Sequence, residues 1–124
     1  MLLTSQTDDV SLSALGDEAR IMLMRHDFSG LANRFGFARA FGRAPSEAIE
    51  AAYLHAAASP HKVASVEHLP ISVRYFKPNS TGLFAVVECT VPLYDGAAVQ
   101  LDLIVTGNGH EKDICIEDIS GVAE

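Results

Sequence analysis

The chain lacks several features that mark large classes of proteins. Its 124 residues favour a single domain over 1–124, include no tryptophan, and contain no apolar run close to the roughly 20 residues of a membrane-spanning helix. The start, MLLTSQTDDVS, has neither the basic nor the long apolar region of a secretory signal, so Cys89 and Cys115 are expected to be reduced thiols. No glycine-rich phosphate loop is present, because GNG at 107–109 lies between predicted strands. These absences predict a cytoplasmic protein with no cofactor and no membrane contact.

Basic residues are also scarce. Nine Lys and Arg oppose 16 Asp and Glu, and the net charge of −7 argues against nonspecific binding to nucleic acid. The charge is uneven: from Glu88 onward only Lys112 opposes eight acidic residues, whereas residues 20–43 hold five arginines and one acid, Asp27. Two solvated faces of opposite sign explain this pattern most simply. The alternative is that these faces steer a dimer or a head-to-tail contact.

Hydrophobic residues make up 48% of the chain and charged residues 20%, as is typical of a globular domain. In the first half, apolar residues recur at spacings of three and four, which predicts helices. One helix follows Ser11 as a possible N-cap, a second follows Asp27, and a third begins near Pro45 and ends before Pro60. Residues 36–44 contain two glycines and fit either a continued helix or a small strand.

The second half alternates apolar and polar residues with a period of two. The alternation predicts strands over 83–93 and 99–105, with an earlier strand around 71–75 that also draws on part of 62–69. Helices followed by antiparallel hairpins give the α+β class.

Turn chemistry sets the expected strand register. Asn108-Gly109 favours a two-residue type I′ turn, which pairs Leu103 with Ile114. In the preceding hairpin a three-residue loop keeps the apolar faces together and pairs Val91 with Leu101.

This register sorts the side chains onto two faces of the sheet. The predicted inner face carries Val87, Cys89, Val91, Leu101, Leu103, Ile114 and Ile116. The predicted outer face carries Glu88, Thr90, Asp102, Asp113, Cys115 and Glu117, together with the apolar Phe84, Val86 and Ile104. Three apolar side chains on an outer face indicate that another surface covers part of it. A homodimer that packs sheet against sheet would provide that surface.

At this point the order of elements resembles the nuclear transport factor 2-like superfamily, which includes ketosteroid isomerase and the polyketide cyclases. The resemblance rests on RHDFSGLANRFG at the second helix, PSEAIEAAYLHA at the third, and the long hairpins from Ile71 to Ile119. It implies three N-terminal helices packed in a curved antiparallel sheet, a cone-shaped α+β barrel with an apolar pocket. It also implies dimers that pack through the sheet.

The catalytic groups of the isomerases do not match this chain. Those enzymes use a carboxylate base on a short strand after the second helix, but residues 36–44 contain no Asp or Glu. They also use a tyrosine on the first helix and a protonated aspartate on a late strand. The first helix here has no tyrosine, and Asp102 is one residue off the pocket face. The resemblance therefore implies a fold rather than this mechanism.

Five residues are candidates for lining an inner pocket. The periodicity of the predicted helix and strand points Tyr53 and Tyr75 inward, and Cys89 lies on the apolar face of its strand. His55 and His68 are expected at the rim of the pocket, where an imidazole can act as an acid or a base. Core packing is the simpler explanation for the tyrosines and for Cys89.

No metal site is expected. His26-Asp27 resembles the paired ligands of metal-dependent phosphohydrolases, but the chain offers no further set of ligands for such a site. His55, His61 and His68 do not have the spacing of zinc ligands.

Two functions follow. The first is binding of a small hydrophobic or amphipathic ligand in an apolar pocket, with or without isomerase, cyclase or dehydratase activity. The second is a noncatalytic protein-interaction module, such as an immunity or accessory factor. It would act through the acidic outer face and its residues Phe84, Val86, Asp102 and Ile104.

Overall fold

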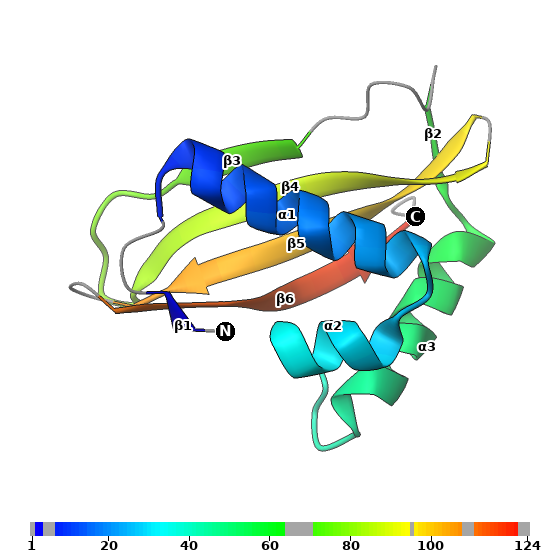
Figure 1. Ribbon diagram of the computed structural model, residues 1–124, viewed down its shortest axis with the longest axis horizontal. Coiled ribbons are helices and arrows are strands. Elements are labelled where there is room, and N and C mark those ends of the chain that lie inside the picture. The colour runs from blue at the N-terminus through cyan, green and yellow to red at the C-terminus, as the bar shows by residue number, and fades with distance from the viewer. Residues whose placement is uncertain (1, 4–6, 64–70, 95, 108–110, 122–124) are drawn as a thin grey trace.

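A computed structural model describes residues 2–3, 7–63, 71–94, 96–107 and 111–121. Over these ranges, three helices pack against one antiparallel sheet of six strands, which confirms the α+β class (Figure 1). No helix in the described part of the chain is long and apolar enough to cross a membrane.

The three helices and the strands β3 to β6 follow one another in the predicted order, whereas the two-residue strands β1 and β2 were not predicted. The helices are α1 (Asp9–Met24), α2 (Phe28–Arg34) and α3 (Pro45–Ala58). The strands are β1 (Leu2–Leu3), β2 (His61–Lys62), β3 (Ile71–Tyr75), β4 (Leu83–Tyr94), β5 (Ala97–Thr106) and β6 (Lys112–Ser120).

Side-chain caps set where two of the helices begin. The predicted cap Ser11 lies inside α1, and Asp8 is the N-cap instead: its carboxylate accepts hydrogen bonds from the backbone N–H and the hydroxyl of Ser11. Asp27 caps α2 as predicted, because its side chain accepts from the N–H of Gly30 at 3.0 Å. Pro45 occupies the first turn of α3, also as predicted.

Residues 36–44 form neither a helix nor a regular strand. Phe37 makes one isolated parallel bridge to Ile116, and the N–H of Ala38 donates to the Ile116 carbonyl at 2.8 Å. The rest is a series of turns in which Gly36, Gly42 and the non-glycine Phe41 adopt positive φ angles. The left-handed residues at 36, 41 and 42 interrupt any regular element.

The sheet is open. Its strand order is β1-β6-β5-β4-β3, and β2 pairs with the first residues of β5. The sheet is neither closed nor strongly curled, so the expected cone-shaped barrel is not observed (Figure 1). Within the described residues, the outermost strands β1 and β3 each pair with a single neighbouring strand.

The β4–β5 register differs from the expected one by two residues, while the faces are preserved. Val91 pairs with Val99 and not with Leu101. The cause is a register shift between Pro92 and Tyr94, which absorbs one residue of β4 and lets Tyr94 pair with Ala97. Because side chains alternate between the two faces with a period of two, a register difference of two residues keeps every side chain on its predicted face.

The β5–β6 register is displaced in a similar way. Leu103 pairs with Ile116 and not with Ile114, and a second shift next to Leu103 brings Asp102 opposite Asp118. The predicted turn residues Asn108-Gly109 lie outside the described residues.

One hydrophobic core fills the space between the helices and the inner face of the sheet. The predicted inner-face residues are all buried, and the helices add Leu12, Ala19, Leu23, Leu31, Phe35, Ile49, Tyr53 and Ala56. Figure 1 shows α1 lying across the sheet and α2 and α3 grouped beside β6. The core therefore occupies the side on which the apolar pocket was expected.

Candidate functional site

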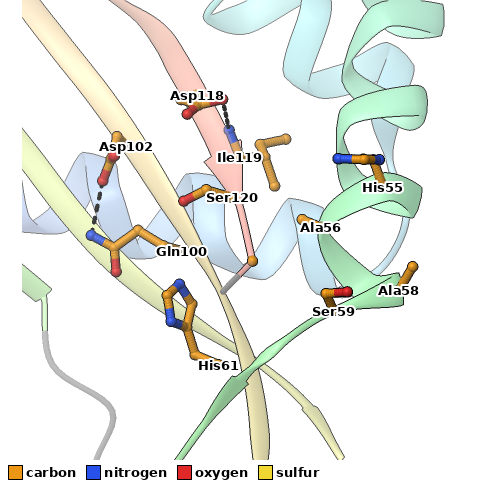
Figure 2. A pocket seen from close by; sticks show the side chains of 11 residues that line it. His55, Ala56, Ala58, Ser59, His61, Gln100, Asp102, Asp118, Ile119 and Ser120 are labelled. Atoms are coloured by element: carbon orange, nitrogen blue, oxygen red, sulfur yellow. Dashed lines mark hydrogen bonds between the residues drawn. The ribbon is translucent and has the colours of Figure 1, made fainter. Parts of the chain in front are cut away.

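A pocket of about 750 Å³ opens on the other side of the sheet (Figure 2). It lies between the C-terminal turn of α3, the strand β2 and the outer face of β5 and β6. The polar side chains that line it come from His55, Ser59, His61, Gln100, Asp102, Asp118 and Ser120. Its size lies within the range of small-molecule sites, but its lining is more polar than is usual for them.

Two strands share the edge of β5 at this pocket. β6 ends at Ser120, which pairs with Gln100, and β2 follows along the same edge with His61 opposite Ala98. Because α3 leads into β2 through Ser59, the helix end and both strands meet at one place. Figure 2 shows His61 next to Gln100 and shows His55 across the pocket on α3.

Gly121 allows the end of α3 to pack closely against the end of β6. A Cβ atom at Gly121 would lie 2.1 Å from the carbonyl oxygen of Ser59 and 2.5 Å from that of Ala56. Both contacts are with backbone atoms, which cannot rotate away. The residue after β6 therefore has to be glycine for the end of α3 to pack here.

Three carboxylates lie in a row across the outer face. Glu88, Asp102 and Asp118 are direct cross-strand partners on β4, β5 and β6, and we refer to them as the acidic row. The amide nitrogen Nε2 of Gln100 donates to Glu88 Oε2 at 3.2 Å and to Asp102 Oδ1 at 3.0 Å. A single neutral amide thus links two of the three carboxylates.

The surroundings of Asp102 disfavour its charge. Burial is the main cause that raises the pKa of the Asp102 carboxyl, and the carboxylates of Glu88, Asp118 and Glu117 raise it further. The hydrogen bond from Gln100 acts in the opposite direction. The Asp102 carboxyl is therefore protonated more easily than an ordinary aspartate.

Among the described residues, few cations lie near this row. Arg74 on the edge strand β3 approaches Glu88 at 3.9 Å, and its side chain is mostly exposed. Within the same ranges no group of three or more His, Cys, Asp or Glu side chains is placed to hold a metal ion. The chemistry that the pocket offers is therefore hydrogen bonding, negative charge and two imidazoles.

Tyr53, predicted to face a pocket, lies in the core. Its hydroxyl is 3.1 Å from Nε2 of His26, and its ring packs against His26 and Phe28 at the junction of α1 and α2. The side chain is 8% exposed, and burial raises the pKa of its hydroxyl. His26, with φ of 57°, ends α1 in the left-handed conformation, so its role is in the helix junction.

Tyr75 and Cys89 do not line the outer pocket either. The Tyr75 hydroxyl donates to the carbonyl of Thr7 at 2.8 Å, and its ring meets Phe84 edge to face. Cys89 is fully buried under α1, where burial raises the pKa of its thiol to about 12. His68 lies outside the described residues, so His55 is the one predicted candidate that the structure places at this pocket.

The predicted partner face is divided. Val86, Asp102 and Ile104 lie on the outer face, where Val86 pairs with Ile104. Phe84 does not join them, because a register shift between Leu83 and Ala85 places it at a bulge. There its ring contacts Tyr75 and lies 4.7 Å from Nζ of Lys112, and it packs against the core.

Sequence reasoning missed Gln100, Asp118, Ser120 and His61 as members of the site. Alternation along β5 does place Gln100 beside Asp102 on one face, so that signal was present. Asp118 joins them only through the shift in the β5–β6 register, and His61 only through the β2–β5 strand pair, whose two strands are separated in the sequence by β3 and β4. Neither relation has a local signature in the sequence.

The relation to known proteins rests on layout alone. Comparisons with protein-family models, with curated proteins and with solved structures find no match to this chain. Three helices ahead of an antiparallel sheet are consistent with the nuclear transport factor 2-like layout without proving it. The open sheet and the filled inner face are departures from what that layout implied.

Proposed function

We propose that the protein is a noncatalytic binding module whose outer-face pocket takes a positively charged group. The group is an amine or guanidinium, carried by a small ligand or by a side chain of a partner protein. The acidic row carries this proposal, because its three carboxylates are direct cross-strand partners. Two of them, Asp102 and Asp118, line the pocket.

The energetics of the row support a cation as occupant. Like charges directly opposite each other on adjacent strands destabilise a sheet. Asp102 is partly removed from water, which adds to the cost of its charge. A bound cation would relieve the repulsion and gain charge-assisted hydrogen bonds, so a feature that is unfavourable to folding becomes favourable to binding.

This proposal replaces an apolar ligand with a cationic one. An inner apolar pocket would require space between α1 and the sheet. A Cβ at Gly16 would lie 2.8 Å from Val87 Cγ1 and 3.0 Å from Cys89 Sγ, so helix and strand are already in contact. A nuclear transport factor 2-like origin remains a proposal supported by the order of elements.

The acidic row also bears on the proposed homodimer. A two-fold contact of sheet against sheet would place the outer face of one copy on the same face of another. Glu88, Asp102 and Asp118 would then face carboxylates of equal charge, which is costly. The row therefore favours a basic partner over a sheet-to-sheet dimer.

Binding can be tested with agmatine, which carries a guanidinium and an amine, and with glutarate as an anionic control. Backbone amide shifts in NMR spectra should saturate with agmatine at residues 100–102 and 118–121. The double substitution of Asp102 and Asp118 by Asn should abolish the effect. Binding should weaken as the pH falls, because Asp102, whose pKa is raised, loses its charge.

The control separates binding at the pocket from general charge attraction. Glutarate at equal ionic strength should leave the same amides unchanged, and Glu50→Gln, an exposed charge change on α3, should bind agmatine normally. Equal shifts with both compounds, or saturation at other residues, would refute the proposal.

Isomerase-type or dehydratase-type activity is a second candidate. A carboxylate with a raised pKa is a stronger base than an ordinary one, and Asp102 lies in a pocket that is also lined by His55 and His61. Exchange of deuterium into small ketones, followed by proton NMR, tests it. Catalysed exchange that disappears in Asp102→Asn would support the activity, and exchange that survives the substitution would exclude this residue as the base.

A further inference from the structure

The loop between α2 and α3 displays an aromatic side chain to solvent. We refer to residues 38–44 as the Phe41 loop. Phe41 is 83% exposed, has a left-handed backbone with φ of 51°, and lies between Arg39 and Arg43 in the sequence. Phenylalanine and arginine are both enriched at protein interfaces relative to the rest of the surface.

The loop is held in place rather than hanging free. Its first residue, Ala38, donates its N–H to the carbonyl of Ile116 on β6, and the N–H of Arg43 donates to the carbonyl of Ala40 at 3.1 Å. Arg39 reaches Glu117 at 3.4 Å. A non-glycine residue in the left-handed region persists only where its surroundings hold it, so the loop holds the backbone at Phe41 in this conformation.

The loop and the pocket lie at opposite ends of one helix. The loop runs directly into Pro45, the first residue of α3, whereas the pocket is lined by Ala58 and Ser59 at its end. A helix of 14 residues is about 21 Å long. The Phe41 loop therefore cannot reach the pocket of its own chain.

We propose that the partner of the Phe41 loop is a second copy of the chain. Phe41 and Arg43 of one copy enter the outer-face pocket of the next, with the Arg43 guanidinium against the acidic row. The inference rests on the proposed function, because the loop supplies the cation that this pocket takes.

Charge complementarity within one sequence supports a second copy as partner. Five arginines fall between residues 20 and 43, while the pocket belongs to a C-terminal half in which eight acidic residues oppose one lysine. Arg43 is exposed and makes no ion pair within the described ranges. The net charge of −7 makes an acidic partner such as nucleic acid the weaker alternative.

The contact joins two different surfaces, so it is heterologous. Each copy offers one loop and one pocket, and such contacts either close into a ring or extend as a chain. Association should therefore depend on concentration and should weaken at high salt, which screens the charges.

Sedimentation velocity over a range of concentrations tests this directly. Phe41→Ala and Arg43→Glu should each weaken self-association at least tenfold. Both positions are exposed on a loop, so the fold should remain intact. Val10→Ala, another exposed apolar residue, and Arg25→Glu, another exposed arginine, should associate like the unchanged chain.

A mixing experiment identifies the two surfaces. Arg43→Ala has a defective loop and an intact pocket, whereas Asp102→Lys has an intact loop and a defective pocket. Neither should associate alone, but their mixture should form a one-to-one complex and nothing larger. A mixture that stays monomeric, or an unchanged chain that is monomeric at every concentration, would overturn the proposal.

The agmatine titration distinguishes this result from failure of the proposed function. Arg43→Glu retains the pocket and should bind agmatine normally. Agmatine binding without self-association would refute the second copy as partner and leave the proposed function standing. If the unchanged chain does not bind agmatine, both the proposed function and the second copy as partner are refuted.

Discussion

Gly16 of α1 lies directly on Val87 of β4. A methyl group at Gly16 would stand 2.8 Å from Cγ1 of Val87, with Cys89 Sγ and Ile71 Cγ2 close behind at 3.0 and 3.3 Å. The absence of a side chain on the helix therefore sets the distance between helix and sheet. This contact fills the inner face and leaves the outer face as the side available for binding.

Replacing Gly16 by Ala should destabilise the protein. Alanine favours a helix over glycine by about 1 kcal/mol, but the new methyl group overlaps the stiff, β-branched Val87. Overpacking of this kind costs roughly 1–3 kcal/mol, so we expect a net loss of up to about 2 kcal/mol. Urea unfolding measures the free energy of unfolding.

A double-mutant cycle tests the cause. Val87→Ala creates space beneath Gly16, so Gly16→Ala should cost less in that background than in the unchanged chain. Equal costs in both backgrounds would show that Val87 is not what opposes the methyl group.

Local signals in the sequence predicted the elements, whereas the register depended on events that leave no local trace. The Asp27 cap and the alternation of β4 and β5 are short-range patterns, and both were confirmed. The shift next to Leu103 is not visible in the sequence, yet it decides that Asp102 faces Asp118 rather than Glu117. The pocket was missed for the same reason, because its residues converge only through long-range strand pairing.

Gly121→Ala should perturb the pocket more than its small size suggests. Its Cβ would overlap the carbonyl oxygens of Ser59 and Ala56, and backbone atoms cannot yield as a flexible side chain would. We expect a loss of about 2 kcal/mol or more in the free energy of unfolding. Amide shift changes should concentrate at the end of α3 and in β2. Gly42→Ala is a contrasting case, since open space surrounds Gly42 and only its positive φ opposes the change.

The two cysteines should react at very different rates. Cys89 is fully buried and burial raises the pKa of its thiol to about 12, so alkylation should require unfolding. Cys115 is half-buried, and burial together with Asp113 and Glu117 raises the pKa of its thiol. Iodoacetamide should modify Cys115 slowly at neutral pH and faster as the pH rises. Peptide mass spectrometry measures both sites, and modification of Cys89 in the native protein would contradict the packing of α1 on β4.

Asp102→Asn should stabilise the protein at neutral pH and have little effect in acid. The pKa of Asp102 is raised in the folded state by burial and by the carboxylates of Glu88, Asp118 and Glu117. A carboxyl whose folded pKa exceeds its unfolded value contributes stability that is present below the unfolded pKa, near 3.8, and is lost as the pH rises through the folded value. Asparagine mimics the protonated acid and does not suffer that loss.

The expected gain at pH 7 is a few tenths to about 1 kcal/mol, the range for a like-charged cross-strand pair. Urea unfolding of Asp102→Asn and of the unchanged chain should give curves that coincide below about pH 3 and diverge as the pH rises. Glu50→Gln removes an exposed charge on α3 outside the row and should show no such divergence. A variant that is less stable than the unchanged chain at pH 7 would mean that the Asp102 carboxylate stabilises the fold. The acidic row would then stabilise the fold by itself, and it would not be a source of repulsion that a bound cation relieves.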